Sequence, residues 1–297
     1  MARPRASIVL VTRDGAATLP AVLDAITRQR FDGAIEIVAV DSSSTDGTRE
    51  LLRQRADCLV SIEPGSFDHG LTRNLGVERA RAEAVVLLVQ DAVPASDTWL
   101  QRLVDGLEAD PSVAGTFARQ IPSDEAGALT RHYAERWLAA STAPRTSQLA
   151  GRDAFECLDP FARFDCCVFD NVCSCIRRSV WLRYPFAATP FAEDLEWART
   201  VLMHGYKICY VPEAAVIHSH ERSAAYELVR TRLLHRRLYD LFGMRTIPTL
   251  PHLGRAVASS LALHVSLERS PRALALAIAW PLGQYLGGRD AAKAATQ

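Results

Sequence analysis

Short apolar runs alternate with helix-like segments through the first part of the chain, and this alternation is the feature that most constrains its fold. The runs are rich in β-branched residues, and they occupy residues 7–12, 35–40, 58–62 and 85–89. Between them, as at 19–26, apolar residues follow helical spacing. Strands that alternate with helices at this length favour a parallel sheet with right-handed crossovers. We therefore predict an α/β fold with a mostly parallel central sheet flanked by helices.

The second half of the chain is less regular. We expect helices over 124–140, 177–182 and 191–204, strands over 168–176, 207–210 and 215–218, and a polar loop over 142–153. Gly205 is a good C-cap for the last of these helices. After Glu221 the sequence predicts Arg-rich helices.

The composition excludes several classes of protein. Lys and Arg together number 34, as do Asp and Glu, so we expect no strong field toward nucleic acid and no nucleic-acid partner. No apolar stretch reaches the roughly 18 to 20 residues that span a bilayer. The apolar run over 8–11 is too short for a signal peptide. We therefore expect a cytoplasmic protein.

The seven cysteines do not resemble a disulfide framework, so free thiols in a reducing cytosol are expected. The pairs Cys166–Cys167 and Cys173–Cys175 raise zinc as an alternative. Structural zinc sites usually use cysteines separated by two to four residues, so this spacing fits zinc poorly. On a strand, Cys173 and Cys175 would share one face and be simply buried.

Polar residues follow each of the four apolar runs. They occupy 12–15, 41–47, 67–74 and 90–92. In an open α/β sheet, ligands bind beyond the carboxyl ends of the strands. An acidic residue at such a place can bind ribose hydroxyls, a base edge or a metal; alternatively, Asp41 and Asp46 only cap a turn and a helix. The four strand ends taken together favour a ligand site.

The turn after the first strand excludes two common nucleotide sites. A dinucleotide-binding turn needs G-x-G-x-x-G, and residues 12–17 contain only one glycine. The phosphate-binding pattern G-x-x-x-x-G-K-[ST] is absent from the whole chain. A nucleotide must therefore be held in another way, and Arg73 at a helix start is a candidate for its diphosphate. The alternative for Arg73 is an ordinary surface arginine.

A set of passages in a fixed order carries a more specific signal. They are residues 7–12, 37–48, 67–74 and 88–92, and downstream 191–197, 205–206, 211–213 and 218–220. Their order and spacing resemble the family 2 glycosyltransferases with a GT-A fold, and most closely their rhamnosyltransferase-like branch. The resemblance covers residues 7 to about 220, and it implies a Rossmann-like nucleotide-binding half.

The resemblance implies roles for residues at the strand ends. The donor-binding positions would be Thr12, Asp14, Asp41, Ser43, Arg73, Gln90 and Asp91, with Asp41 reading the base or ribose. Asp91 stands where such enzymes place the last acid of a D-x-D metal motif, although Gln90 and Ala92 leave it as the only carboxylate. His218 matches a histidine that completes the metal shell. The implied cofactor is Mg²⁺ or Mn²⁺, which would neutralise charge on the leaving nucleoside diphosphate.

The resemblance also implies a catalytic carboxylate. In this family the Asp of an acidic pair is the general base, which here is Asp194 of Glu193-Asp194. Inversion by direct displacement needs such a base to take the acceptor hydroxyl's proton. Asn171, Glu193 and Trp197 would contact the acceptor or sugar. Taken without the other motifs, the two acids would only favour the macrodipole of a helix N-terminus.

The domain organisation follows from the extent of the resemblance. We predict a glycosyltransferase domain over 1–221, divided into a nucleotide-binding half, 1–120, and an acceptor-side half, 121–221. Residues 222–297 would form a helical C-terminal extension. Its basic residues around Leu233 and its later apolar segment, 273–286, suggest peripheral contact with a membrane surface. The alternatives are packing on the core and a homodimer contact.

The predicted function is an inverting glycosyltransferase of cell-surface polysaccharide synthesis. The best donor is deoxythymidine diphosphate rhamnose, and the acceptor is a hydroxyl of a glycan or lipid-linked molecule, met at the inner face of the membrane. The alternative is a non-catalytic partner protein that binds a nucleotide sugar on the same fold. A sugar nucleotidyltransferase would need a Gly-rich, basic loop after the first strand, and residues 12–17 do not supply one.

Overall fold

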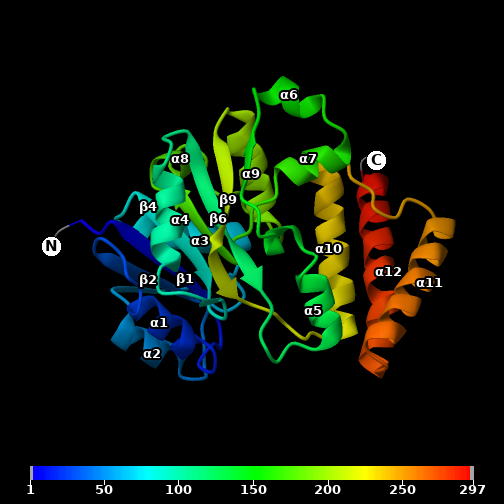
Figure 1. The fold of residues 1–297 in the computed structure, drawn as a ribbon, viewed down its shortest axis with the longest axis horizontal. Helices are drawn as coiled ribbons and strands as arrows, with labels where there is room; N and C mark the ends of the chain where they lie inside the picture. The colour runs from blue at the N-terminus through cyan, green and yellow to red at the C-terminus, as the bar shows by residue number, and fades with distance from the viewer. Residues whose placement is uncertain (1–2, 295–297) are drawn as a thin grey trace. The chain divides into compact units, whose positions relative to one another are not determined.

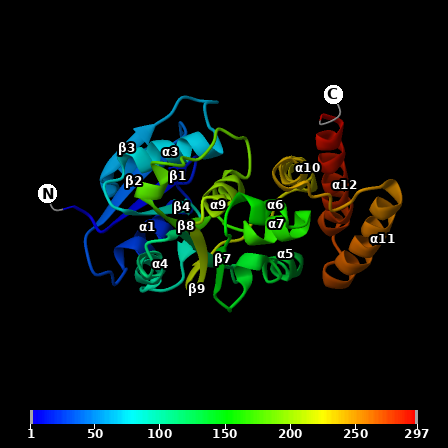
Figure 2. The same cartoon turned by 90° about the horizontal axis from the view of Figure 1, so that it is seen from above.

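The computed structural model describes residues 3–294, which form two compact units (Figures 1 and 2). The first, called the sheet unit, runs to residue 121 and includes 136–156 and 167–218. The second, called the helical unit, contains 122–135, 157–166 and the chain from 219 onward. The expected boundary at 221 lies close to this last division. The helical unit also takes in two earlier segments that the sequence analysis assigned to the first domain.

The sheet unit is built on a nine-stranded sheet with the order β3-β2-β1-β4-β8-β6-β9-β5, and β7 pairs with β9. The strands are β1 (Ala6–Thr12), β2 (Ile35–Asp41), β3 (Cys58–Ser61), β4 (Ala84–Val89), β5 (Val93–Pro94), β6 (Val113–Ile121), β7 (Arg145–Gln148), β8 (Cys173–Arg177) and β9 (Lys207–Ile217). β1 is parallel to β2 and to β4, β2 is parallel to β3, and β6 is parallel to β9. β8 is antiparallel to both β4 and β6. The predicted α/β class with a mostly parallel sheet is confirmed.

Helices cover both faces of this sheet. The helices of the sheet unit are α1 (Leu19–Thr27), α2 (Thr48–Arg55), α3 (His69–Arg79), α4 (Trp99–Glu108), α6 (Arg152–Glu156), α8 (Arg178–Trp181) and α9 (Glu193–Met203), and a short 3-10 helix η1 spans Leu138–Ala140. Ile8 and Leu10 pack with α1, α2 and α4 in one core cluster. On the other face α3 lies so close that a Cβ on Gly76 would meet the Val9 side chain at 2.2 Å. Figure 2 shows α3 and α1 on opposite faces.

Several elements differ from the sequence expectations. The helix expected over 124–140 is shortened to α5 (Ala128–Ala134), with η1 following it. The loop expected over 142–153 contains β7 and the start of α6. The two strands expected over 207–218 are one strand, β9, which passes through Pro212. A break in its register against β6, between Ala118 and Arg119, accommodates a residue that cannot donate to a ladder.

The helical unit contains α5, α7 (Pro160–Cys166), α10 (Ala224–Phe242), α11 (Leu250–Leu267) and α12 (Pro271–Ala294). Two glycines let α10 and α12 approach closely. A Cβ on Gly283 would lie 2.9 Å from the Thr231 side chain, and one on Gly287 would lie 2.4 Å from the carbonyl oxygen of Arg232. Among the described residues, none of the helices has the length and apolar character needed to cross a membrane.

The close contact between α10 and α12 predicts the effect of adding a single methyl group. Gly287→Ala should lower the free energy of unfolding by about 1–3 kcal/mol, because the new Cβ overlaps backbone atoms of α10 that cannot move independently. The matched control is Gly254→Ala in α11, where a Cβ would meet nothing within 4 Å. That change should stabilise the protein by up to about 1 kcal/mol, since alanine favours helix over glycine. Urea unfolding followed by circular dichroism measures both, and equal midpoints would contradict the packing argument.

Candidate active site

The first part of the site is a carboxylate and an imidazole at the ends of two strands. Asp91 follows β4 and His218 follows β9. The backbone N–H of His218 donates to the carbonyl of Ile121 at 2.9 Å. Nε2 of His218 lies 3.7 Å from a carboxylate oxygen of Asp91. Both belong to a group of residues whose ligand atoms are close enough together to hold one metal ion. The structure therefore brings the two predicted metal ligands together.

A hydrogen-bonded chain orients the imidazole of His218. The side-chain amide nitrogen of Gln120 donates to Asp170 at 2.6 Å, so its amide oxygen faces Nδ1 of His218 at 3.0 Å. This network assigns the proton of the neutral ring to Nδ1. Nε2, on the side of Asp91, then carries the lone pair that a metal ligand needs.

The second part of the site is the acidic pair at the start of α9. Glu193 is the first residue of the helix, and it is preceded by Ala192, whose φ of 60° lies in the left-handed region. A non-glycine residue there is strained, and such strain concentrates at functional sites. One carboxylate oxygen of Asp194 accepts the backbone N–H of Leu195 at 2.8 Å, and the other accepts that of Asn171 at 3.4 Å.

The two acids have opposite electrostatic environments. Burial, followed by the neighbouring charges of Glu193 and Asp170, raises the pKa of Asp194 well above its ordinary value. Burial also acts to raise the pKa of Glu193, but Arg73, His69 and an Asn171 hydrogen bond outweigh it and lower that pKa. Two carboxylates whose environments separate their pKa values in this way are typical of acid–base sites. Of the two, Asp194 has the raised pKa that suits a general base.

The third part of the site is the loop after β2, where Asp41 is completely buried. Its carboxylate accepts the hydroxyl of Thr12 at 3.2 Å, and both the hydroxyl and the backbone N–H of Ser44. Two buried polar atoms next to it, Oγ of Ser42 and Nε of Arg49, have no hydrogen-bond partner among the described residues. Buried polar groups are normally paired, so these two are candidates for contact with a ligand.

The loops after β1, β2 and β4 are tied to one another through predicted donor-site residues. The Gln90 side chain accepts the backbone N–H of Arg13 at 2.8 Å and donates to the Arg13 carbonyl at 2.9 Å. Asp14, at a φ of 45°, accepts the backbone N–H of Thr45 at 2.9 Å. Ser43, at a φ of 58°, donates to the carbonyl of Ile62. The structure thus gathers Thr12, Asp14, Asp41, Ser43 and Gln90 at one edge of the sheet, where they hold the loops in shape.

Arg73 and Trp197 lie elsewhere than expected. Arg73, predicted at the donor diphosphate, is buried and pairs with Glu193 at 3.1 Å. Trp197, predicted at the acceptor, is only 2% exposed, packs against Phe169 and Phe186, and donates its indole N–H to the carbonyl of Tyr184. We correct the expectation for Trp197: its ring belongs to the core and has no surface to offer a sugar.

Asn171 and Glu193 were both predicted to contact the acceptor or sugar; in the structure they contact each other, and both are buried. The Asn171 amide donates to Glu193 at 3.1 Å and accepts the hydroxyl of Ser174 at 2.8 Å. Gln120 and Asp170 had no role predicted from the sequence, although they bond to each other and Gln120 bonds to His218. Gln120 was missed because no strand was predicted over 113–121. The apolar run over 113–118 is the signal that could have revealed it.

The cysteines form no part of the site. All seven are free thiols. Cys173 and Cys175 are buried on β8, as the burial interpretation predicted, and burial raises the pKa of both. Cys173 accepts the indole N–H of Trp99 at 3.3 Å. A thiol held neutral in this way is a poor metal ligand, because the thiolate is the form that binds.

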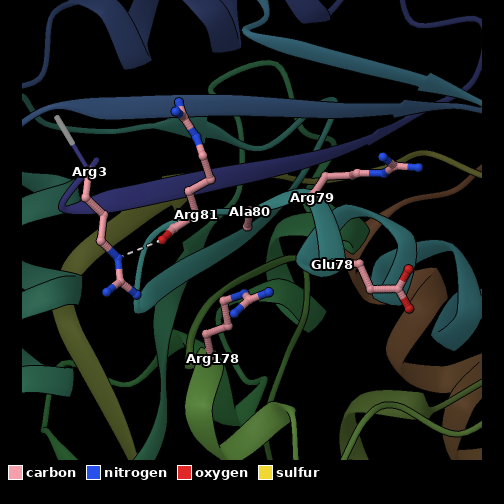
Figure 3. A pocket seen from close by; sticks show the side chains of 6 residues that line it. All are labelled: Arg3, Glu78, Arg79, Ala80, Arg81 and Arg178. Carbon is pink, nitrogen blue, oxygen red and sulfur yellow. Dashed lines mark hydrogen bonds between the residues drawn. The ribbon is translucent and has the colours of Figure 1, made fainter. Parts of the chain in front are cut away.

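A cavity of about 470 Å³ lies at the opposite end of the parallel strands. Its lining residues are Arg3, Glu78, Arg79, Ala80, Arg81 and Arg178. Figure 3 shows that the guanidinium groups of Arg79 and Arg81 point away from that of Arg178. Arg81 is paired with Glu36, and Arg3 donates to the Arg81 carbonyl. Since these groups do not converge and lie far from the acidic pair along the strands, this cavity is not the active site.

Comparison with known proteins agrees with this geometry. The family model described as glycosyl transferase family 2 matches residues 7–172, more than half of the chain. The O-antigen chain rhamnosyltransferase RfbN of Salmonella typhimurium is 28% identical over 231 residues, which are 75% of this chain and 69% of that protein. The O-antigen chain rhamnosyltransferase WbaN of Salmonella anatum is 31% identical over 199 residues, covering 66% of this chain and 60% of that protein. The chain thus spans about two thirds of the length of these relatives.

Solved structures share the fold at low sequence identity. The mannosyltransferase PcManGT from Pyrobaculum calidifontis, in complex with GDP-Man and Mn²⁺, superposes with a TM-score of 0.55 at 19% identity, covering 100% of this chain and 76% of that chain. TarS 1-349 of S. aureus gives a TM-score of 0.54 at 13% identity, covering 98% and 92%. These likenesses confirm the predicted GT-A fold. With the family match over most of the sheet-forming sequence, they show that the chain belongs to glycosyl transferase family 2 and is a glycosyltransferase.

Proposed function

We propose that the chain transfers L-rhamnose from deoxythymidine diphosphate rhamnose to a hydroxyl of a glycan or lipid-linked acceptor, with inversion, in cell-surface polysaccharide synthesis. The observation that carries this proposal is the hydrogen-bonded chain that runs from His218, beside Asp91, through Gln120 to Asp170, whose charge acts on Asp194. This arrangement supports a site for the leaving diphosphate close to a proton acceptor. The named activity of the two Salmonella relatives supports rhamnose as the sugar.

The reaction is a single displacement. The acceptor oxygen forms a bond to the anomeric carbon of the donor while its proton passes to a carboxylate oxygen of Asp194. The bond between the anomeric carbon and the diphosphate oxygen breaks, and its electron pair leaves with the nucleoside diphosphate. Asp194 suits this role because its raised pKa gives the carboxylate more affinity for the proton than an ordinary aspartate has.

Asp91 and His218 would hold a divalent cation, Mg²⁺ or Mn²⁺. The donor set of one carboxylate oxygen and one imidazole nitrogen, 3.7 Å apart and with the nitrogen lone pair directed to the carboxylate side, fits such an ion. The ion would supply positive charge to the oxygens of the leaving diphosphate. PcManGT, which shares the fold, was solved with Mn²⁺.

The loop around Asp41 would receive the nucleotide. Its carboxylate is fixed by Thr12 and Ser44 and lies 3.9 Å from Nε of Arg49. It can therefore position Arg49 and the adjacent Ser42 hydroxyl, neither of which makes a hydrogen bond at that atom among the described residues. Asp14 is more exposed than Asp41 and would contact the donor directly. Gln90 and Ser43 would act by holding the loops. The non-catalytic alternative is not favoured, because a binding protein has no need for a base such as Asp194.

We further propose peripheral contact with the inner face of the membrane in the cytoplasm. The exposed side of α10 carries Tyr226, Val229 and Leu233, together with Arg230 and Arg236. Residues at these spacings share one face of a helix. Apolar side chains interleaved with arginines fit an anionic lipid surface. A lipid-linked acceptor would be met there.

Replacement of the base tests the reaction. Asp194→Asn should fold and bind donor nearly as the wild type does, but it should cut turnover by about 10²- to 10⁴-fold, because no other group takes the proton. Transfer from deoxythymidine diphosphate rhamnose to an isolated glycan acceptor measures the rate. Asp153→Asn, at an exposed carboxylate of α6, is the matched control and should retain full turnover. A normal rate in Asp194→Asn would exclude this residue as the base.

Removal of the metal ligand tests the cation site. Mn²⁺ should raise the donor affinity of the wild type, and Asp91→Ala should abolish that increase, because one of the two strand-end ligands is lost. Calorimetric titration of the donor with Mn²⁺ and with excess chelator measures this. Full activity in chelator would show that Asp91 is only a polar contact.

Charge removal on α10 tests the membrane contact. The double variant Arg230→Gln/Arg236→Gln should pellet less with anionic phosphatidylglycerol vesicles at low salt, since each basic residue near such a surface contributes about 1 kcal/mol. High salt should remove the binding of the wild type as well. Arg28→Gln/Arg79→Gln removes the same charge from exposed positions of the sheet unit and should bind like the wild type. If all four conditions leave the protein in the supernatant, the α10 face is better explained as a dimer contact.

A further inference from the structure

Glu193 and Arg73 form a buried ion pair that the reaction described above does not use. Nη1 of Arg73 lies 3.1 Å from a carboxylate oxygen of Glu193, and the same oxygen accepts the Asn171 amide at 3.1 Å. The side chains of Arg73 and Glu193 are only 9% and 4% exposed. Nη1 of Arg73 also donates to the carbonyl of His69 at 3.0 Å. Neither charge is therefore accessible to an acceptor sugar.

A buried ion pair of this kind contributes little to the free energy of unfolding. Two charges lose their hydration when they are buried, and well-packed apolar residues often replace such a pair without loss. What the pair does achieve is a permanent negative charge at a defined place. That place is next to Asp194, the following residue of α9, which belongs to the first turn of the same helix.

We propose that Arg73 and Glu193 are positioning residues, which fix a negative charge beside Asp194 so that Asp194, and not Glu193, accepts the proton of the acceptor hydroxyl. The proposal rests on the proposed function, since it explains how the base is selected from two adjacent acids. Arg73 holds Glu193 in place and keeps it ionised, and the buried carboxylate of Glu193 then acts on Asp194 only through its electric field.

The charged groups that face Asp194 come from three segments. Glu193 lies on α9, Asp170 precedes β8, and Arg73 lies on α3. Both acids raise the pKa of Asp194, whereas Arg73 lowers it; His69 faces Glu193. Removal of the Glu193 charge should therefore lower the pKa of Asp194. Removal of the Arg73 charge should raise the pKa of both acids, because each loses a lowering influence, and Glu193 would then compete with Asp194 for the proton.

The first test needs no substrate. The pKa of Asp194 is higher in the folded state than in the unfolded state, where it is about 3.9. The wild type therefore loses stability as the pH rises from about 3.9 to the folded-state pKa, and below about 3.9 Asp194 causes no such loss. Asp194→Asn should therefore unfold at a higher temperature than the wild type, by a margin that grows as the pH rises through this window. In a Glu193→Gln background the same margin should shrink. Thermal unfolding of the full chain between pH 4 and 8 measures it.

The second test follows the acid limb of the pH–rate profile for kcat/KM. Glu193→Gln should move that limb to lower pH, by about one unit or more, and Arg73→Gln should move it to higher pH. Arg73→Lys keeps the charge and should restore much of the wild-type position. A merely structural role would lower stability in all three variants but would not shift the limb in opposite directions.

Controls separate the possible failures. Glu36→Gln removes the charge of another buried carboxylate, which pairs with Arg81 at 2.5 Å. It should lower the free energy of unfolding without moving the acid limb of the pH–rate profile. If Glu193→Gln does not fold, the double variant Arg73→Gln/Glu193→Gln carries both tests, with a smaller shift to lower pH. An unchanged Asp194→Asn margin and an unchanged limb in the Glu193 variants overturn the proposal. Loss of the transfer reaction itself would instead count against the proposed function, and the unfolding test would still decide the role of the pair.

Discussion

Parallel pairing of β1 with β2 and β4 is the constraint on which the site depends. Thr12 is in register with Asp41, and Val11 with Val89, so the three strands end at one edge of the sheet. The loops that follow must then approach one another, and their backbone groups need partners once they are covered. Gln90, Asp14 and the loop after β2 provide these partners by bonding across strand ends. The same geometry places Asp91, the residue that follows Gln90, at this edge of the sheet.

Burial then determines how each acid behaves. A carboxylate shut away from water must be paired or change its pKa, and the acids of the sheet unit show both outcomes. Asp41 is hydrogen-bonded on both oxygens and so is held in a fixed position, and Glu193 is paired with Arg73, which lowers its pKa. Among the described residues, the carboxylate of Asp194 accepts hydrogen bonds only from backbone N–H groups, and the charges of Glu193 and Asp170 act on it. It is therefore the group that gains most from accepting a proton.

Residues far apart in the sequence complete the candidate site, and contacts between such residues could not be predicted from the sequence. The four N-terminal strands were predictable because each is a continuous apolar run, and Asp91, Asp194 and His218 were proposed as site residues from their place in motifs. β6 was not predicted, and with it Gln120 was missed. Its partners are 50 and 98 residues away, and no local pattern indicates such a bond. Trp197 was misassigned because its helical position says nothing of which face is buried.

The sequence by itself determined the alternation of strands and helices, the polar character of each strand end and the acids that are candidates for the chemistry. These are properties of neighbouring residues, since periodicity and turn chemistry act over a few positions. Only the tertiary structure decided which acid is held ionised and which is poised to take a proton, because that depends on Arg73 from α3 and Asp170 from the segment before β8 meeting α9. Electrostatic energy depends on distance in space and on exclusion of water, and neither is written in the order of residues along the chain.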